Sequence, residues 1–98
     1  MSEFLPQSFD VSVTGGEGEI TRTVGGLVMA VGVIPPDAAA KYDVTGYDAE
    51  GFLLYFGDDV VGNVNMAARA QIFGTHRVVI SQASHNGIYK VKLWFENW

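Results

Sequence analysis

The chain has 98 residues, of which 48% are hydrophobic, 12% aromatic and only 17% charged, with a formal net charge of −5 at pH 7. This length fits one domain, and the composition excludes a disordered acidic segment. Cysteine is absent, which excludes a disulfide framework, a thiolate metal site and redox chemistry at sulfur. The negative charge argues against non-specific binding to nucleic acid, and the shortage of charges indicates that part of the surface contacts other chains.

The first seven residues, MSEFLPQ, are expected to form an N-terminal arm, because nothing in them alternates and Pro6 interrupts a hydrogen-bonded ladder. Residues 8–98 are expected to form a single β-sandwich domain. The start has no basic segment followed by an apolar stretch, and the longest apolar run is far shorter than the ~20 residues of a membrane helix. We therefore expect synthesis in the cytoplasm and no contact with a membrane.

Strand signals begin at residue 8. SFDVSVT alternates apolar Phe9, Val11 and Val13 with polar residues, which predicts a strand with one buried face. The β-branched content of EITRTV predicts a second strand. Glycines follow both segments, at positions 15, 16 and 18 and at positions 25 and 26. They lack the spacing of a phosphate-binding loop, so we expect them to form hairpin turns.

The run Leu27–Ile34 is apolar or glycine at every position. Such a strand is suited to burial on both faces, yet a small sandwich has only one interior layer. Strict alternation places the odd-numbered residues on one face, namely Leu27, Met29, Val31 and Val33. We predict that this face is covered by another chain or by the N-terminal arm.

The segments KYDVTGY and FLLYF flank the turn DAEG and predict a hairpin over residues 41–56. GDDVVGN, residues 57–63, is expected to be a loop or a short edge element. VNMAARAQIFG, residues 64–74, is ambiguous. Asn65 could cap a short helix, but the alternation of apolar residues favours an extended or irregular segment.

The last third of the chain has the clearest pattern. HRVVISQAS and GIYKVKLWF flank Asn86-Gly87, which is a strong signal for a tight hairpin turn. In the final strand the predicted core face carries Tyr89, Val91, Leu93 and Phe95, and the outer face carries Ile88, Lys90, Lys92 and Trp94. Tryptophan is enriched at interface hot spots, so burial of Trp94 and Trp98 against a neighbour is favoured over folding back on their own core. Seven or eight short strands of this kind predict an all-β fold, an antiparallel β-sandwich or jelly roll.

Candidate catalytic and metal-binding residues are few. His76 and His85 are the only histidines and lack the spacing of a catalytic triad or a zinc pair, so we expect strand-edge or turn residues, with an interface role as the alternative. Four acidic residues could gather at one end of the sheet and hold Ca²⁺, namely Asp43, Asp48, Asp58 and Asp59. No spacing resembles an EF-hand loop, and solvated turn residues are the preferred interpretation. We predict no enzymatic activity, no cofactor and no metal.

Aromatic side chains offer a second hypothesis, because β-sandwiches can stack sugars on exposed rings. The candidates are Tyr42, Tyr47, Tyr55, Trp94 and Trp98. Most aromatic residues of so small a domain belong to its core, so a carbohydrate- or receptor-binding module is the alternative rather than the first choice.

Charges are divided unevenly along the chain. Ten acidic residues precede residue 60, against Arg22 and Lys41, whereas four basic residues follow it, against Glu96. If folding separates these halves, one copy could meet another with opposite potentials; if folding intermixes them, no such field results.

Residues 71–95, QIFGTHRVVISQASHNGIYKVKLWF, resemble the closing segment of many small virion proteins of tailed bacteriophages, in which a G-x-x-x-V-x-I-x-x-A-x-x-x-G-x-Y run forms the final hairpin. The matching positions are Gly74, Val78, Ile80, Ala83, Gly87 and Tyr89. The earlier FDVSVT and GGLVMAVGVIP also look like the opening of such proteins. The resemblance implies a β-sandwich building block of a capsid or tail: a decoration or cement protein, or a minor neck or tail component.

We therefore expect a non-enzymatic structural protein located in the virion after synthesis in the host cytoplasm. It is expected to form a homo-oligomer, such as a trimer or ring, and to contact other virion proteins such as a major capsid or tail protein. The predicted contact residues are Leu27, Met29, Val31, Val33, Trp94 and Trp98.

Overall fold

The computed structural model describes the backbone of residues 3–97, together with all of their side chains except those of residues 3–6, 24, 69–73, 96 and 97. This part of the chain forms six strands and no helix. The strands are β1 (Glu3–Val13), β2 (Gly18–Ile34), β3 (Lys41–Tyr47), β4 (Leu53–Val61), β5 (Val64–Ser81) and β6 (Gly87–Asn97). Accordingly, residues 3–97 contain no helix of the length and apolarity needed to cross a membrane.

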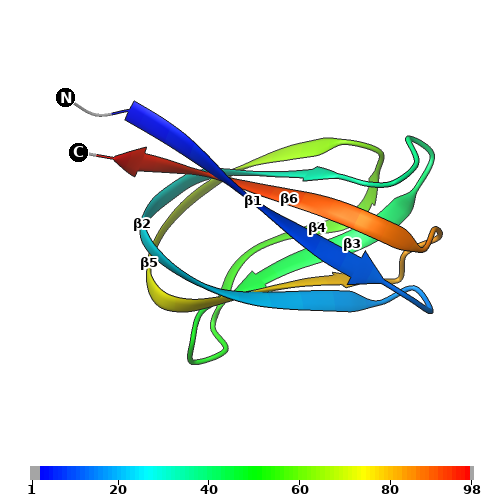
Figure 1. Cartoon of the computed structure of the whole chain (residues 1–98), viewed down its shortest axis with the longest axis horizontal. Helices are drawn as coiled ribbons and strands as arrows, with labels where there is room; N and C mark the ends of the chain where they lie inside the picture. Colours follow the sequence, from blue (N-terminus) through cyan, green and yellow to red (C-terminus); the bar gives the residue numbers. More distant parts are fainter. Residues whose placement is uncertain (1–2, 98) are drawn as a thin grey trace.

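The two longest strands, β2 and β5, pair along their length and bend together at one end of the molecule (Figure 1). The strand order is β1-β6-β2-β5-β3-β4. The second half of β2 and the first half of β5 join β1 and β6 in what we call sheet 1; their other halves join β3 and β4 in sheet 2. The resulting eight strand segments form two four-stranded antiparallel sheets. The predicted all-β sandwich is confirmed, and this order of segments is that of a jelly roll.

Glycines mark the bend between the sheets. Gly26 has a φ of +138° and Gly74, on the neighbouring strand, a φ of +100°. Side chains rarely allow such backbone angles, so glycine is needed where a strand turns sharply. The expectation that Gly25-Gly26 forms a turn between two separate strands is wrong, because β5 follows the same bend and the ladder continues through it.

Residues 3–7 belong to β1 and not to an arm. Glu3 pairs with Asn97 and Gln7 pairs with Leu93, so the ladder with β6 covers the whole segment. β1 is the first strand in the order and needs partners on one side only. Such an edge strand tolerates Pro6, which is why the proline does not break the pairing.

Loops carry the chain from one sheet to the other after β1, β2, β4 and β5, and the first and last of these loops contact each other. Gly15 and Gly16, with φ of +64° and +81°, form a turn as expected, but the expected hairpin is wrong because β1 and β2 are not neighbours in the strand order. The predicted hairpin at Asn86-Gly87 is wrong, because β5 ends in sheet 2 and β6 begins in sheet 1, so these strands are not neighbours. The Asn86 side chain instead accepts a hydrogen bond of 3.1 Å from the Gly16 amide and links the two loops.

The other predicted elements are found. β3 and β4 form the expected hairpin, and β4 extends to Val61 as the edge element expected for residues 57–63. Residues 64–74 are extended within β5, so the helical alternative is wrong. The sheet pairing with β2 stabilises this segment where its own sequence was ambiguous.

The core lies between the two sheets. The predicted core faces of residues 9–13 and 89–95 are confirmed. Tyr42 and Tyr89 pack edge to face, with ring centroids 5.1 Å apart and planes at 79°. The Tyr42 hydroxyl donates a hydrogen bond of 2.7 Å to the Gly62 carbonyl, and burial raises the pKa of Tyr42 to about 12. Tyr42 is therefore a core residue and not a platform for sugars.

Candidate functional site

The apolar run Leu27–Ile34 is interrupted by a β-bulge at Met29. The register with both neighbouring strands shifts at this residue. Val28 on one side of the bulge and Val31 and Val33 on the other are all fully buried. The strict alternation expected for this run is wrong, because the bulge changes which parity faces the core. The predicted contact residues Val31 and Val33 belong to the chain's own core and have no surface to offer another chain.

The remaining predicted contact residues lie in different places. Leu27 and Met29 are half-buried, and Trp98 lies outside the described residues. Trp94 is half-buried on the outer face of sheet 1, where its ring covers Gly32. A Cβ at position 32 would lie only 2.9 Å from Trp94 Cζ3. Glycine therefore lets the ring lie close against the backbone of β2.

Trp94 belongs to an outward face of sheet 1 that combines apolar and basic side chains. We call it the lysine–tryptophan face, and it consists of Ile34, Ile88, Lys90, Lys92 and Trp94. Ile34 and Ile88 are 40% and 49% exposed. Asp10 of β1 pairs with Lys90, so one carboxylate borders the two lysines of this face. The predicted outer face of β6 is thereby confirmed.

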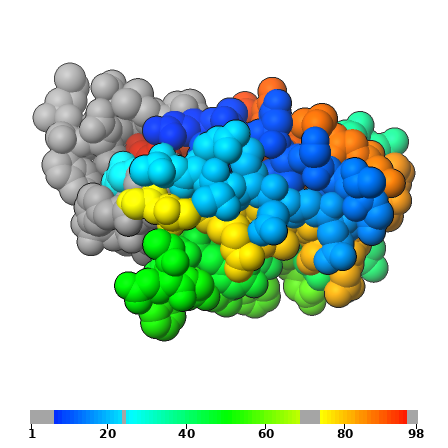
Figure 2. Space-filling model, turned by 60° about the horizontal axis from the view of Figure 1, so that its bottom comes forward, coloured from blue at the N-terminus to red at the C-terminus, as the bar shows by residue number. Residues whose placement is uncertain are grey.

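A second surface, which the sequence did not reveal, follows β4. Four large apolar side chains here are each more than half exposed: Phe52 (65%), Leu53 (54%), Phe56 (63%) and Val61 (60%). We call these residues the β4 edge, because β4 is the last strand of the order and has no outer neighbour within the described chain. The β3–β4 turn, in green, projects from the body of the molecule in both views (Figures 1 and 2). The pattern FLLYF predicts a strand, but it does not show that this strand lies at an edge of the sheet.

The β4 edge continues onto the outer face of sheet 2. Leu53 pairs with Tyr47, which pairs with Arg77 of β5. The Arg77 guanidinium carbon lies 4.6 Å from the centre of the Tyr47 ring, and the same guanidinium donates a hydrogen bond of 3.2 Å to the Glu19 carboxylate. Apolar, aromatic and charged groups of the kinds enriched at protein interfaces are thus contiguous here.

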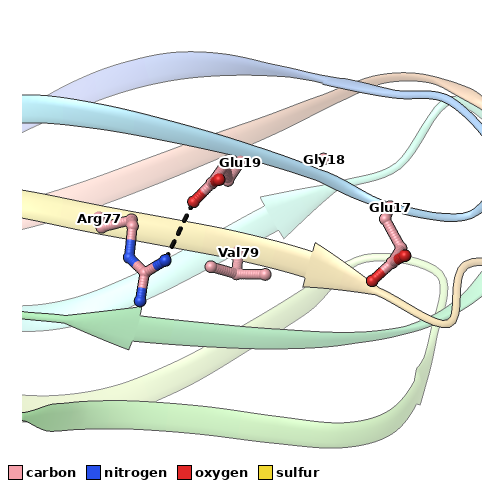
Figure 3. Close-up of a pocket in the computed structure, with 5 residues that line it drawn as sticks. All are labelled: Glu17, Gly18, Glu19, Arg77 and Val79. Atoms are coloured by element: carbon pink, nitrogen blue, oxygen red, sulfur yellow. Dashed lines mark hydrogen bonds and ion pairs between the residues drawn. The ribbon is translucent and has the colours of Figure 1, made fainter. Parts of the chain in front are cut away.

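An open groove lies beside this ion pair, between β2 and β5 (Figure 3). It has a volume of about 320 Å³ and is lined by Glu17, Gly18, Glu19, Arg77 and Val79. The Glu19 carboxylate is turned towards Arg77, whereas Glu17 lies apart from it (Figure 3). The ion pair is exposed on both sides, so it contributes little to stability.

Three carboxylates meet near the end of β4. Atoms of Asp43, Asp58 and Asp59 lie within 4.8 Å of one another. A side-chain hydrogen bond to Asp43 raises the pKa of Asp58, and the negative charges of Asp43 and Asp59 raise it further. The Asp59 amide donates a hydrogen bond of 2.8 Å to Asp43, and Lys41 lies 3.8 Å from Asp59. Carboxylate oxygens are the ligands that Ca²⁺ prefers, so these three aspartates are the residues that could hold a cation.

Asp48, the fourth acid expected in this group, has a different role. Its carboxylate accepts hydrogen bonds of 2.9 Å from the amides of Glu50 and Phe52 and so closes the β3–β4 turn. An aspartate that binds backbone amides two residues further on is typical of turns. The interpretation of Asp48 as a turn residue is confirmed.

His76 is buried in the core, contrary to the expectation of a strand-edge residue. It is 1% exposed, and its Nε2 atom lies 2.8 Å from the Tyr55 hydroxyl, while Nδ1 has no hydrogen-bond partner among the described residues. Burial lowers the pKa of His76, and the backbone of Tyr47 raises it by a smaller amount. Burial raises the pKa of Tyr55. The pair is therefore neutral and enclosed, which suits a structural role. His85 lies in the loop, as expected, 2.8 Å from the Ser84 hydroxyl.

Comparison with protein-family models and with curated proteins finds no match for this chain. The resemblance to bacteriophage virion proteins remains a prediction. The function is therefore argued from the lysine–tryptophan face and the β4 edge.

Proposed function

We propose that this protein is a non-enzymatic structural subunit that assembles with copies of itself. The observation that carries the proposal is the β4 edge, whose four apolar side chains are each more than half exposed. Exposed apolar patches on a small domain mark sites of protein–protein contact, and an edge strand with free backbone groups can pair with another chain. Assembly covers this surface.

The assembly is proposed to stabilise a bacteriophage capsid or tail, as a decoration or cement protein does, with a major capsid or tail protein as the further partner. The resemblance of residues 71–95 to small virion proteins supports this setting. The jelly roll is also an architecture of viral capsid domains. Lectins and cupins share it, so the fold supports the proposal without selecting it.

A carbohydrate- or receptor-binding module is the second candidate. Trp94 favours it, because its half-exposed ring lies against Gly32 on the outer face of sheet 1, beside Lys92. Rings held in this way are common platforms for the apolar faces of sugars.

The mass in solution separates the two candidates. We expect analytical ultracentrifugation of the purified protein to show an oligomer that dissociates on dilution, and Phe56→Ser to shift it to the monomer with an unchanged circular dichroism spectrum. Phe56 is largely exposed, so this change removes contact area without opening the core. A wild-type monomer at every concentration, together with saccharide binding on a glycan array, would reject self-assembly in favour of the second candidate.

A further inference from the structure

We propose that the β4 edge of one copy docks on the lysine–tryptophan face of a second copy, in a head-to-tail contact. This inference rests on the proposed self-assembly and names the two surfaces that make it. The partner of each subunit is then another copy of the same chain, which presents a different face.

The β4 edge is apolar at its centre and acidic at its flanks. Glu50 precedes the exposed phenylalanine at position 52, and Asp58 and Asp59 follow the one at position 56; all three acidic side chains are exposed. Lys41 lies 3.8 Å from Asp59 and offsets one of these charges, so the flanks remain net negative. A carboxylate oxygen of Asp43 lies within 4.8 Å of those of Asp58 and Asp59 and adds a third negative charge at this flank. The matching surface must therefore be apolar and must carry positive charge.

Pairing of two β4 edges around a twofold axis does not meet this requirement. Antiparallel pairing would place Glu50 of each copy near the end of β4 that carries Asp58 and Asp59 in the other, where like charges repel. The charge distribution therefore argues against the symmetric contact that an edge strand otherwise favours.

The lysine–tryptophan face does meet the requirement. Lys90 and Lys92 lie on the same side of β6 as Ile88 and Trp94, and Ile34 of β2 pairs with Lys90. The close seat of Trp94 on Gly32 removes the obstacle that a projecting ring would present. The face offers two ammonium groups, one of them beside the Asp10 carboxylate, together with exposed apolar surface. Its net positive charge complements the acidic flanks of the β4 edge, and its apolar side chains complement the apolar centre.

The area agrees with a specific contact. A whole phenylalanine side chain offers ~200 Å², so Phe52 and Phe56, at 65% and 63% exposure, present roughly 250 Å² between them. Leu53 and Val61 add a smaller amount. If the partner face buries a similar area and a polar rim surrounds both, the two subunits together bury on the order of 1,000 Å². This is the lower limit for a specific interface. Each subunit makes this contact twice, so the assembly is a ring where the rotation closes and a filament where it does not.

Complementary charge reversal tests the contact. The first variant, Lys90→Glu/Lys92→Glu, makes both surfaces negative, and the second, Glu50→Lys/Asp58→Lys, makes both positive. We expect each variant alone to associate about tenfold more weakly than wild type or worse. We expect an equimolar mixture to co-assemble with the two variants alternating, because each contact between unlike variants pairs opposite charges. Arg22→Glu, an exposed position outside both surfaces, is the control and should assemble like wild type. Masses are measured by ultracentrifugation, and circular dichroism checks each fold.

Each other outcome overturns the proposal in a recognisable way. If the first variant assembles normally, the lysine–tryptophan face takes no part in the contact. If both variants assemble normally, self-assembly stands but uses another surface. If wild type is monomeric throughout, the proposed function fails as well. In the first variant, the glutamate at position 90 would face Asp10 of β1, and this like-charge pair could unfold the protein. Lys92→Glu alone then repeats the test with one reversed charge.

Discussion

Gly46 and Gly32 both lie against aromatic rings, in opposite environments. Gly46 of β3 faces the interior, where the Tyr55 ring of β4 packs directly on it; Gly32 of β2 faces outwards, where the Trp94 ring of β6 covers it. Tyr55 is 7% exposed, whereas Trp94 is only half-buried. The same pairing of a glycine with an aromatic residue on an adjacent strand thus serves the core in one sheet and an outer face in the other.

The difference shows what constrains each ring. Tyr55 is held by the packed core and by its hydrogen bond to His76, so it has nowhere to move. Trp94 lies at the surface and can lift into solvent. A substitution at Gly46 should therefore act on the free energy of unfolding, and one at Gly32 on the shape of the lysine–tryptophan face.

The largest effect on the free energy of unfolding is expected for Gly46→Ala. The added methyl group would overlap the Tyr55 ring, and overpacking of this kind costs roughly 3 kcal/mol where neither group can yield. This is a large part of the stability of a small domain. Urea denaturation should show a lower midpoint at an unchanged slope.

Gly51→Ala is the matched control for this variant. Gly51 lies in the β3–β4 turn with a φ of +85° and with open space around a Cβ, so it should lose only about 1–2 kcal/mol from backbone strain. Equal losses at both positions would show that contact with Tyr55 does not govern the effect.

A smaller effect is expected from acidification, through the buried partner of Tyr55. Burial lowers the pKa of His76 below the 6.5 of the unfolded chain, so the unfolded state binds the proton first. Stability should therefore fall as the pH drops from about 7.5 to about 5.5. The described side chains around His76 agree with a lowered pKa, because none of them carries a negative charge that would favour the protonated ring. Arg22 is the cross-strand neighbour and is positive, and Tyr55 is neutral.

His76→Gln keeps an amide that can bond to the Tyr55 hydroxyl but does not titrate in this range. The difference in unfolding free energy between wild type and this variant should narrow as the pH falls. Carboxylates such as Asp58 contribute equally to both proteins and cancel. A constant difference across the range would mean that His76 is not the group responsible.

The predictable parts of this fold are those that depend on local alternation. The buried faces of residues 9–13 and 89–95 follow from period-two patterns, and the sandwich follows from the number of such segments. The bend at Gly25-Gly26 and the bulge at Met29 were not predictable, since each is set by the partner strands. An apolar run contains no signal for the residue at which its parity changes.

The candidate surfaces show the same limit. The outer face of β6 could be assigned, because lysines alternate with core residues there. The β4 edge and the burial of His76 could not, because exposure depends on whether another strand lies alongside, which is a property of the strand order. The turn signal of Asn86-Gly87 likewise reports a local bend and not which strands pair.

The smallest effect on stability, and the one that bears most on assembly, is expected for Gly32→Ala. A Cβ 2.9 Å from Trp94 Cζ3 displaces a ring that can move outwards, so the unfolding free energy should change by less than about 1 kcal/mol. The raised ring would separate the lysine–tryptophan face from its partner surface, and the dissociation constant of the oligomer should rise. Gly15→Ala, in a turn with open space around it, should cost as much stability or more through its φ of +64° and leave the dissociation constant unchanged. Weaker assembly in both variants would attribute the change to lost stability, whereas weaker assembly in Gly32→Ala alone would assign it to the position of Trp94.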